Sequence, residues 1–392
     1  MRFDIWKECP KVPLPSVLLT VVDNRGKTVP AAPSGHKLIA TNCIRNENLY
    51  PVYEKIRYLS EETYRTWFRA HPEPGDIIFV CKGTPGRVCL VPDPIDFCIA
   101  QDMVALRANP KIVYNKYLLA VLRSFQIQEQ ILSTSVGDVI PHFKKSFFNQ
   151  IMIPIPNMDI QKSIGDFYYT ISEKTELNKK INDNLADLLQ TVYQERFGDT
   201  SLVANQGSLY DICSYSRDKV VVSELNVSTY FSTENMLPGK AGAIEATSLP
   251  TTPQTTACHK GDTLVSNIRP YFKKIVYCED ACGCSADVLC FTPNQPQYSA
   301  YLFSTLYADK FFAFMVAGSK GTKMPRGDKQ QIMTYPVVLP SEAALDEFNA
   351  IALPLIEQIY SNRAENKRLS LLRDTLLPKL MSGEIDVSTV YL

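Results

Sequence analysis

The sequence predicts an α+β fold in which two β-rich domains are joined by two long antiparallel coiled-coil helices, with a pseudo-two-fold internal repeat. Three observations predict this fold. The sequence is similar to itself after a displacement of 184 positions, the separation of Gly137 from Gly321. Short runs of β-branched and aromatic residues, closed by turn residues, occupy the first part of each repeat. A long amphipathic segment with a seven-residue apolar period occupies the second part.

The repeat divides the chain into four segments. Ile155-Pro156 falls on Leu339-Pro340, and farther upstream the offset drifts slightly, so that Asp102 corresponds to Asp287. Drift is expected where loops differ in length, and the period is too long for a solenoid. The predicted segments are a first β-rich domain at 1–153, a central spacer helix at 154–198, a second β-rich domain at 199–336 and a C-terminal spacer helix at 337–392.

The strands predicted within each β-rich domain are short. They include Asp76–Val80 and Val88–Val91 in the first domain, and Thr263–Val265 and Lys274–Tyr277 in the second. Two further stretches, Tyr114–Leu132 and its counterpart Tyr298–Val316, have a helical pattern. Each domain is therefore expected to be α+β.

The two spacer helices are predicted to pair with each other along a narrow seam. The seam positions are Asn178, Asn182, Leu185 and Leu188 in the first helix and Asn362, Asn366, Leu369 and Leu372 in the second. Buried asparagines penalise every register that leaves an amide unpaired, so they favour one antiparallel register. That register pairs Asn178 with Asn366, Asn182 with Asn362, Leu185 with Ile359, Leu188 with Ile356 and Tyr168 with Leu376.

The ends of the two helices also have sequence signals. Gly198 is expected to end the first helix, and Pro378 with Gly383 the second. Pro354 lies inside the second pattern and predicts a kink or a later start of that helix. An antiparallel pair would relate the two β-rich domains by a pseudo-two-fold axis, the symmetry that a DNA duplex presents to a dimer, with half-sites roughly 34 Å apart. Because the two domains differ in sequence, the expected target is bipartite and non-palindromic.

The composition excludes some classes of protein. The 392 residues are 45% apolar and 21% charged, which is typical of a globular chain and not of a disordered one. Apolar runs such as Ile77–Val80 are far shorter than the roughly 20 residues of a membrane helix, and Met1–Pro15 lacks the apolar core of a signal peptide. We therefore expect a cytoplasmic protein. The formal net charge of zero does not decide whether DNA is bound, because a whole-chain sum hides local patches.

The eleven cysteines follow no disulfide framework. The densest group is Cys278, Cys282, Cys284 and Cys290, whose spacing lacks the paired C-x2-C knuckles of structural zinc sites. In a reducing compartment such cysteines are expected to be small buried hydrophobes. No metal site is predicted.

Several stretches, taken in order along both repeats, resemble the specificity subunits of type I restriction-modification systems. In the first repeat they are GDIIFVCKGTPGRV, IAQD, the Gly137–Pro141 turn and ELNKKINDNLADLLQ; in the second they are YFSTENMLPGKAG, GDTLVSNIRPYFKKI and LRDTLLPKLMSGEI. The resemblance covers about Trp6 to Val387, and Pro354 with the short Ser341–Leu345 lead-in departs from it. It implies a non-catalytic DNA-binding subunit with two target-recognition domains.

The resemblance also implies partners. Members of this family pair with two DNA-methyltransferase subunits that modify adenine at N6, and the addition of two motor-nuclease subunits allows restriction of unmodified DNA. S-adenosylmethionine, ATP and magnesium would belong to those partners, and no cofactor is expected in this chain. The acidic outer faces of the spacer helices are candidate contacts for the methyltransferase subunits.

Basic and polar residues at matching places in both repeats are candidates for DNA contact. Phosphate contacts supply affinity, whereas Asn and Arg side chains can bind adenine and guanine edges. The candidates in the first domain are Lys82, Thr84, Arg87, Ser135, His142, Lys144 and Lys145. In the second domain they are Ser266, Asn267, Arg269, Tyr271, Lys273, Lys274, Lys320, Lys323 and Arg326.

Enzymatic motifs are not found in the sequence. There is no Asn/Asp-Pro-Pro-aromatic tetrapeptide of an adenine methyltransferase, and Arg25–Thr28 lacks the first glycine of a phosphate-binding loop, since position 21 is Val. Four histidines show no metal or triad spacing. Two alternatives stay open: a nuclease with unfamiliar acidic residues, and an interaction protein whose coiled coil serves assembly.

Overall fold

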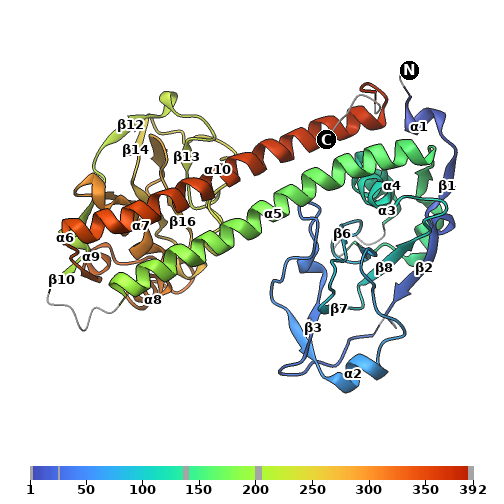
Figure 1. Ribbon diagram of the computed structural model, residues 1–392, viewed down its shortest axis with the longest axis horizontal. Helices are drawn as coiled ribbons and strands as arrows, with labels where there is room; N and C mark the ends of the chain where they lie inside the picture. Colours follow the sequence, from blue (N-terminus) through green and yellow to red (C-terminus); the bar gives the residue numbers. More distant parts are fainter. Residues whose placement is uncertain (1–2, 25–26, 136–140, 199–204, 387–392) are drawn as a thin grey trace. The chain divides into compact units, whose positions relative to one another are not determined.

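The computed structural model describes residues 3–24, 27–135, 141–198 and 205–386 (Figure 1). Most of the predicted turn at Gly137–Pro141 lies outside these residues. The chain forms two compact units, Met1–Lys179 with Ala364–Leu392, and Lys180–Arg363. Each unit is one β-rich domain together with a part of both long helices, α5 (Met158–Phe197) and α10 (Glu342–Met381). The long helices are therefore divided between the units and do not form a separate body.

The first unit contains three antiparallel or mixed sheets. The largest has the order β2 (Leu18–Asp23), β8 (Met103–Ala108), β5 (Ile77–Val80) and β6 (Val88–Leu90). A second has the order β4 (Arg57–Leu59), β3 (His36–Ile39) and β7 (Phe97–Ile99), and β1 (Lys11–Pro13) pairs with β9 (Met152–Pro154). The short helices are α1 (Ile5–Glu8), α2 (Glu61–Thr66), α3 (Asn115–Arg123) and α4 (Phe125–Thr134).

Strand β5 is the centre of the first domain. Successive side chains of a strand point to opposite faces. Ile77 and Phe79 join the core beneath α3, whereas Ile78 and Val80 join a second core with β3 and β7. Because both faces are buried, the strand is a continuous apolar run and not an alternating one.

The second unit repeats the order of the main sheet and of the two-stranded sheet, whereas its remaining sheet has four strands where the first unit has three. Its main sheet has the order β11 (Cys213–Tyr215), β18 (Val288–Pro293), β15 (Thr263–Ser266) and β16 (Ile275–Tyr277). A second sheet has the order β12 (Lys219–Val221), β14 (Gln254–Cys258), β17 (Cys282–Cys284) and β13 (Tyr230–Phe231), and β10 (Gln206–Ser208) pairs with β19 (Pro336–Val338). The short helices are α6 (Leu209–Ile212), α7 (Ser299–Tyr307), α8 (Asp309–Ala317) and α9 (Lys329–Met333). The predicted fold class is confirmed.

Each predicted helical stretch in the domains is in fact a pair of helices. The break between α3 and α4 falls at Ser124, and the break between α7 and α8 falls at Ala308. Both residues have extended backbone, with φ −65° and ψ 150° at Ser124 and φ −63° and ψ 141° at Ala308. The predicted helical character of both stretches is confirmed, and the breaks were not predicted because the apolar pattern continues through them. The break recurs at the repeat distance.

The long helices differ from their predictions at the prolines. Helix α5 ends at Gly198 as predicted, where the Gly198 N–H donates to the Gln194 carbonyl at 2.9 Å. Helix α10 runs without interruption through Pro354 and Pro378, so the predicted later start and the predicted stop at Pro378 are wrong, whereas the helix does end just before Gly383, which has φ 69°. A helical proline removes one hydrogen bond. We attribute its tolerance at Pro354 to burial of the flanking Ala352 and Ile356 in the core of the second unit.

The asparagine pairs of the helix seam are confirmed, each inside one unit. In the first unit, the Asn178 Nδ2 donates to the Asn366 Oδ1 at 2.8 Å. In the second, the Asn362 Nδ2 donates to the Asn182 Oδ1 at 2.8 Å. In both units, residues farther along α5 contact residues nearer to the start of α10. At both asparagine pairs the helices are therefore antiparallel and in the predicted register.

Two of the predicted seam leucines lie outside the seam, while Leu185 and Leu369 are half-buried. Leu188 is 47% exposed, and the adjacent Leu189 is buried with Ile356 instead. Leu372 is 43% exposed. A helix of 3.6 residues per turn drifts by roughly 20° per heptad, so a strict seven-residue extrapolation fails a turn or two from the asparagines.

Candidate nucleic-acid interface

The loop that follows the central strand is fastened in the same way in both units. We call Lys82–Arg87 and Asn267–Lys274 the strand-exit loops, and 141–145 and 320–327 the facing loops. In the first unit, Gly83 N–H donates to the Pro141 carbonyl at 2.9 Å and Phe143 N–H to the Cys81 carbonyl at 2.8 Å. The second unit repeats both bonds, from Arg269 N–H to the Pro325 carbonyl at 2.8 Å and from Gly327 N–H to the Asn267 carbonyl at 3.2 Å.

A third backbone contact completes the frame. Cys81 N–H donates to the Asp102 carbonyl at 2.8 Å, and Asn267 N–H donates to the Asp287 carbonyl at 2.9 Å. The sequence comparison had matched these two aspartates. The isolated bridges Lys82–His142 and Ile268–Arg326 are also equivalent. In each unit the structure thus brings together the candidate residues of the strand-exit loop and of the facing loop, which are far apart in the sequence. We call this repeated set of backbone hydrogen bonds the backbone frame.

In the first unit most of the candidate cations reach the surface. Lys82, His142, Lys144 and Lys145 are exposed, and Thr84 and Arg87 are half-buried. Lys145 forms an ion pair with Asp23. Ser135 lies apart from this group, at the end of α4, where its Oγ donates to the Ile131 carbonyl at 2.8 Å. That bond gives Ser135 a local structural role.

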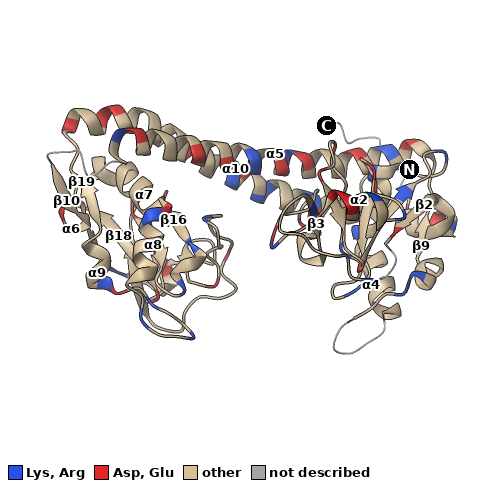
Figure 2. Cartoon of the chain, turned by 90° about the horizontal axis from the view of Figure 1, so that it is seen from below, with Lys and Arg blue, Asp and Glu red and all other residues tan. Residues whose placement is uncertain are grey.

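In the second unit the exposed candidates are Tyr271, Lys320, Lys323 and Arg326, while Arg269, Lys273 and Lys274 are half-buried. Several cations have a carboxylate beside them. Lys320 contacts Asp328 at 2.7 Å, Arg326 contacts Asp287 at 3.2 Å and Lys273 contacts Asp309 at 3.0 Å. Figure 2 shows Lys and Arg interspersed with Asp and Glu in each unit. A phosphate would therefore compete with these aspartates for the same cations.

Two candidates do not present their side chains. Ser266 is 2% exposed and Asn267 5% exposed, because they end the buried strand β15. The Ser266 Oγ donates to the Ile268 carbonyl at 3.1 Å. The expectation that these two side chains are offered to base edges is not met in this structure. Their position supports the loop instead.

Lys240 was missed by the sequence analysis. It lies in the loop Leu237–Gly242, where Gly239 N–H donates to the Phe272 carbonyl at 2.8 Å and Lys240 N–H to the Lys273 carbonyl at 2.9 Å. Lys240 and Lys273 share Asp309, and their hydrogen bonds lower the pKa of that carboxyl. No local motif marks Lys240, because its place beside the strand-exit loop depends on a contact between distant segments.

The left-handed residues have a common chemical character. Among the described residues, every non-glycine residue with positive φ is a Lys or an Arg: Lys55, Lys240, Arg269 and Lys273. Such backbone costs about 1–3 kcal/mol and persists only where the surroundings determine it. Arg269 and Lys273 lie in the second strand-exit loop, and Lys240 lies in the loop that is hydrogen-bonded to it. The backbone thus holds these cations in place before any ligand is bound.

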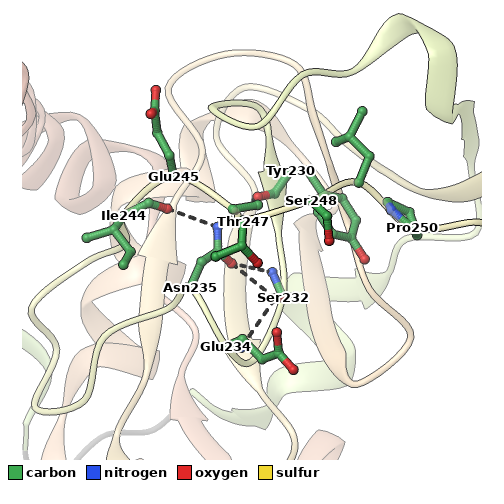
Figure 3. A pocket seen from close by; sticks show the side chains of 11 residues that line it. Tyr230, Ser232, Glu234, Asn235, Ile244, Glu245, Thr247, Ser248 and Pro250 are labelled. Atoms are coloured by element: carbon green, nitrogen blue, oxygen red, sulfur yellow. Dashed lines mark hydrogen bonds between the residues drawn. The ribbon is translucent and has the colours of Figure 1, made fainter.

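A pocket of about 280 Å³ with a mixed polar and apolar lining opens next to these loops in the second unit (Figure 3). Asn235 organises it, since its Oδ1 accepts from the Ser232 N–H at 2.6 Å and its Nδ2 donates to the Ile244 carbonyl at 2.9 Å. Glu234 and Glu245 line the pocket. Lys274 joins it to the strand-exit loop by donating to the Thr233 carbonyl. Carboxylates repel phosphate, so this pocket suits an amino group better than a DNA backbone.

The cysteines are all free and buried. Five of them, Cys258, Cys278, Cys282, Cys284 and Cys290, belong to one apolar core of the second unit. Within the described part of the chain, no three Cys, His, Asp or Glu side chains are arranged to hold a metal ion. Over the same residues, no helix is both long enough and apolar enough to span a membrane.

Comparisons with known proteins agree with this architecture. Residues 32–186 match the family described as "Type I restriction modification DNA specificity domain". The chain is 22% identical over 306 residues to the type I restriction enzyme MjaIX specificity subunit of Methanocaldococcus jannaschii, covering 70% of each chain. It is 24% identical over 129 residues to the HindI specificity subunit of Haemophilus influenzae, covering 32% of this chain and 28% of that one.

A solved structure has the same fold. The type I restriction-modification S subunit from M. genitalium superposes with a TM-score of 0.55 at 17% identity, covering 95% of this chain and 96% of that one. Both relatives and the solved structure are type I specificity subunits, and residues 32–186 match the corresponding DNA specificity domain. The chain is therefore similar to type I specificity subunits over about 70% of its length.

Proposed function

We propose that this chain reads a bipartite, asymmetric DNA sequence and directs adenine-N6 methylation and restriction by partner subunits. One observation carries the proposal: the same backbone frame occurs twice with different side chains on it. The first strand-exit loop offers Lys-Gly-Thr-Pro-Gly-Arg, and the second offers Arg-Pro-Tyr-Phe-Lys-Lys after its buried start. Two units with the same backbone frame but different side chains are suited to read two half-sites that differ in sequence.

In this proposal the exposed cations contact phosphates and set the register on the duplex. Lys82, Lys144 and Lys145 serve the first unit, and Lys320, Lys323 and Arg326 serve the second. Lys145, Lys320 and Arg326 exchange their aspartate partners for phosphate when DNA is bound. This exchange weakens non-specific binding, so that base contacts contribute a larger share of the affinity. The loop geometry before binding is supported by the repeated hydrogen bonds between the strand-exit and facing loops.

Catalysis would belong to the partners: two methyltransferase subunits with S-adenosylmethionine, and two motor-nuclease subunits with ATP and magnesium. The long helices offer a docking surface for the methyltransferases. On the acidic faces of these helices, Glu173 accepts a hydrogen bond from Tyr169 and Glu365 accepts one from Asn178, so both carboxylates are engaged within the first unit. Leu177 is 49% and Leu371 69% exposed on the same helices. Exposed leucines on an otherwise polar helix favour a protein contact there.

The test is methylation mapping by single-molecule sequencing of DNA from cells that express this chain with its methyltransferase. The proposal predicts one bipartite, asymmetric N6-methyladenine motif that disappears when this chain is omitted. A motif that persists without the chain contradicts the proposal. Metal-dependent cleavage of DNA by the purified chain would favour a nuclease instead.

A further inference from the structure

Two adjacent aromatic rings stand at the surface of the second strand-exit loop. Tyr271 is 50% exposed and Phe272 is 39% exposed. Their ring centroids are 4.8 Å apart and their planes are tilted by 56°. Large rings are normally covered in a folded domain, so an exposed pair on a loop favours a binding role.

The loop holds the two rings rigidly. Arg269 before them and Lys273 after them both have left-handed backbone, with φ 50° and φ 51°. Phe272 N–H donates to the Arg269 carbonyl at 2.9 Å, and Lys273 N–H to the Pro270 carbonyl at 2.9 Å. The carbonyl of Phe272 accepts from Gly239 at 2.8 Å. Since the backbone is already ordered, little conformational entropy is lost when the rings contact a ligand.

The surroundings of the rings are cationic. Lys274 Nζ lies 6.0 Å from the centre of the Phe272 ring, and Lys240 and Lys273, which share the carboxylate of Asp309, lie on the adjoining loops. Among the described residues, the Arg269 Nε has no hydrogen-bond partner although it is buried. Apolar rings between cations match a nucleic acid, which offers stacked bases flanked by phosphates. A protein partner of ordinary composition would not require so many cations.

The first unit has no such pair on the equivalent loop. Thr84, Pro85 and Gly86 take that place, and Pro85 and Gly86 are buried. The aromatic pair is therefore a difference between two otherwise equivalent frames, and the first unit is an internal control for its effect.

We propose that Tyr271 and Phe272 form a wedge that enters the stack of the DNA duplex at one base step of the half-site read by the second unit. The cations around the loop hold the flanking phosphates. The half-site read by the first unit stays stacked. This inference rests on the proposed function, because it assigns the rings a role within that DNA recognition.

The test uses the complex of the full chain with its methyltransferase subunits and its mapped target. 2-Aminopurine is placed in turn at each position of both half-sites except the methylated adenines, and its fluorescence is measured without S-adenosylmethionine. We expect a several-fold rise at one step of a single half-site. The double variant Y271A/F272A should abolish that rise and weaken specific binding by about tenfold, the size expected for the loss of one stacked base.

Tyr210→Ala is the matched control, since Tyr210 is a 55% exposed tyrosine of the same unit that lies outside the strand-exit and facing loops. This variant should behave as wild type. Thermal unfolding establishes that the double variant is folded.

If wild type binds and methylates its target but no position brightens, or if Y271A/F272A behaves as wild type, the wedge is wrong. If Y271A/F272A fails to assemble with the methyltransferase subunits, the rings serve a protein contact and the wedge is also wrong. Failure of the wild-type complex to select any target would instead refute the proposed function.

Discussion

The buried amide pair of the second unit allows a quantitative test of the helix register. Asn182 is 8% exposed and Asn362 6% exposed, and one hydrogen bond of 2.8 Å joins them. In the variant N362L, the Asn182 Oδ1 stays buried without a donor. An unsatisfied buried polar group costs about 1–3 kcal/mol. We expect N362L and N182L each to lower the free energy of unfolding by this amount.

The double variant N182L/N362L should recover most of that loss, because two leucines replace the amide pair with apolar contact. The two single losses sum to about 2–6 kcal/mol and the double variant should lose little, so the coupling energy in a double-mutant cycle is expected to approach that sum. Urea unfolding of the full chain, followed by tryptophan fluorescence and circular dichroism, measures it. Coupling near zero would show that the two amides do not interact, and the register derived from them would then fail.

The equivalent pair of the first unit is a matched control for this cycle. Asn178 donates both to the Asn366 Oδ1 and to the Glu365 Oε2, at 2.8 and 2.6 Å. Because a second acceptor remains when Asn366 is replaced, N366L should cost less than N362L. Equal losses would show that this difference in hydrogen bonding has no energetic effect.

Three further predictions concern the loops and the cores. Lys323→Ala should weaken DNA binding to all sequences and lower the salt dependence of log K by about one ion, measured by fluorescence anisotropy from 50 to 200 mM salt; a change of sequence preference would argue for a base contact instead. Arg123→Ala removes donors to the Asn48 and Val88 carbonyls and to the Tyr168 hydroxyl, so we expect a loss of about 1.5–3 kcal/mol in urea unfolding, and no loss would show that these bonds are dispensable. Burial raises the pKa of the Cys81 thiol to about 12, so iodoacetamide at pH 8 should label Cys81 only after unfolding; rapid labelling of the native chain would contradict the buried strand exit.

Features that depend on residue type and repeat spacing were predictable from the sequence. The duplicated frame follows from matching residues such as Asp102 and Asp287, and the helix register follows from paired asparagines whose alternatives leave amides unpaired. The strands were also predictable, because a continuous apolar run such as Ile77–Val80 indicates a strand that is buried on both faces.

Features that depend on contacts between distant segments were not predictable. The burial of Asn267 follows from the sheet around β15, and Lys240 joins the strand-exit loop only through bonds to Phe272 and Lys273. Leu189, and not the predicted Leu188, is buried at the seam, and this depends on how α5 packs on the core of the second unit. A local periodicity contains no information on any of these contacts.

The central claim is that the two units read different halves of one DNA target. The measurement that tests it most directly is methylation mapping of complexes with substitutions confined to one unit, Lys82→Ala with Arg87→Ala in the first and Arg269→Ala with Tyr271→Ala in the second. Each pair should relax or change one half of the bipartite motif and leave the other half intact. A change in both halves from either pair, or a single continuous motif in the wild type, would contradict the claim.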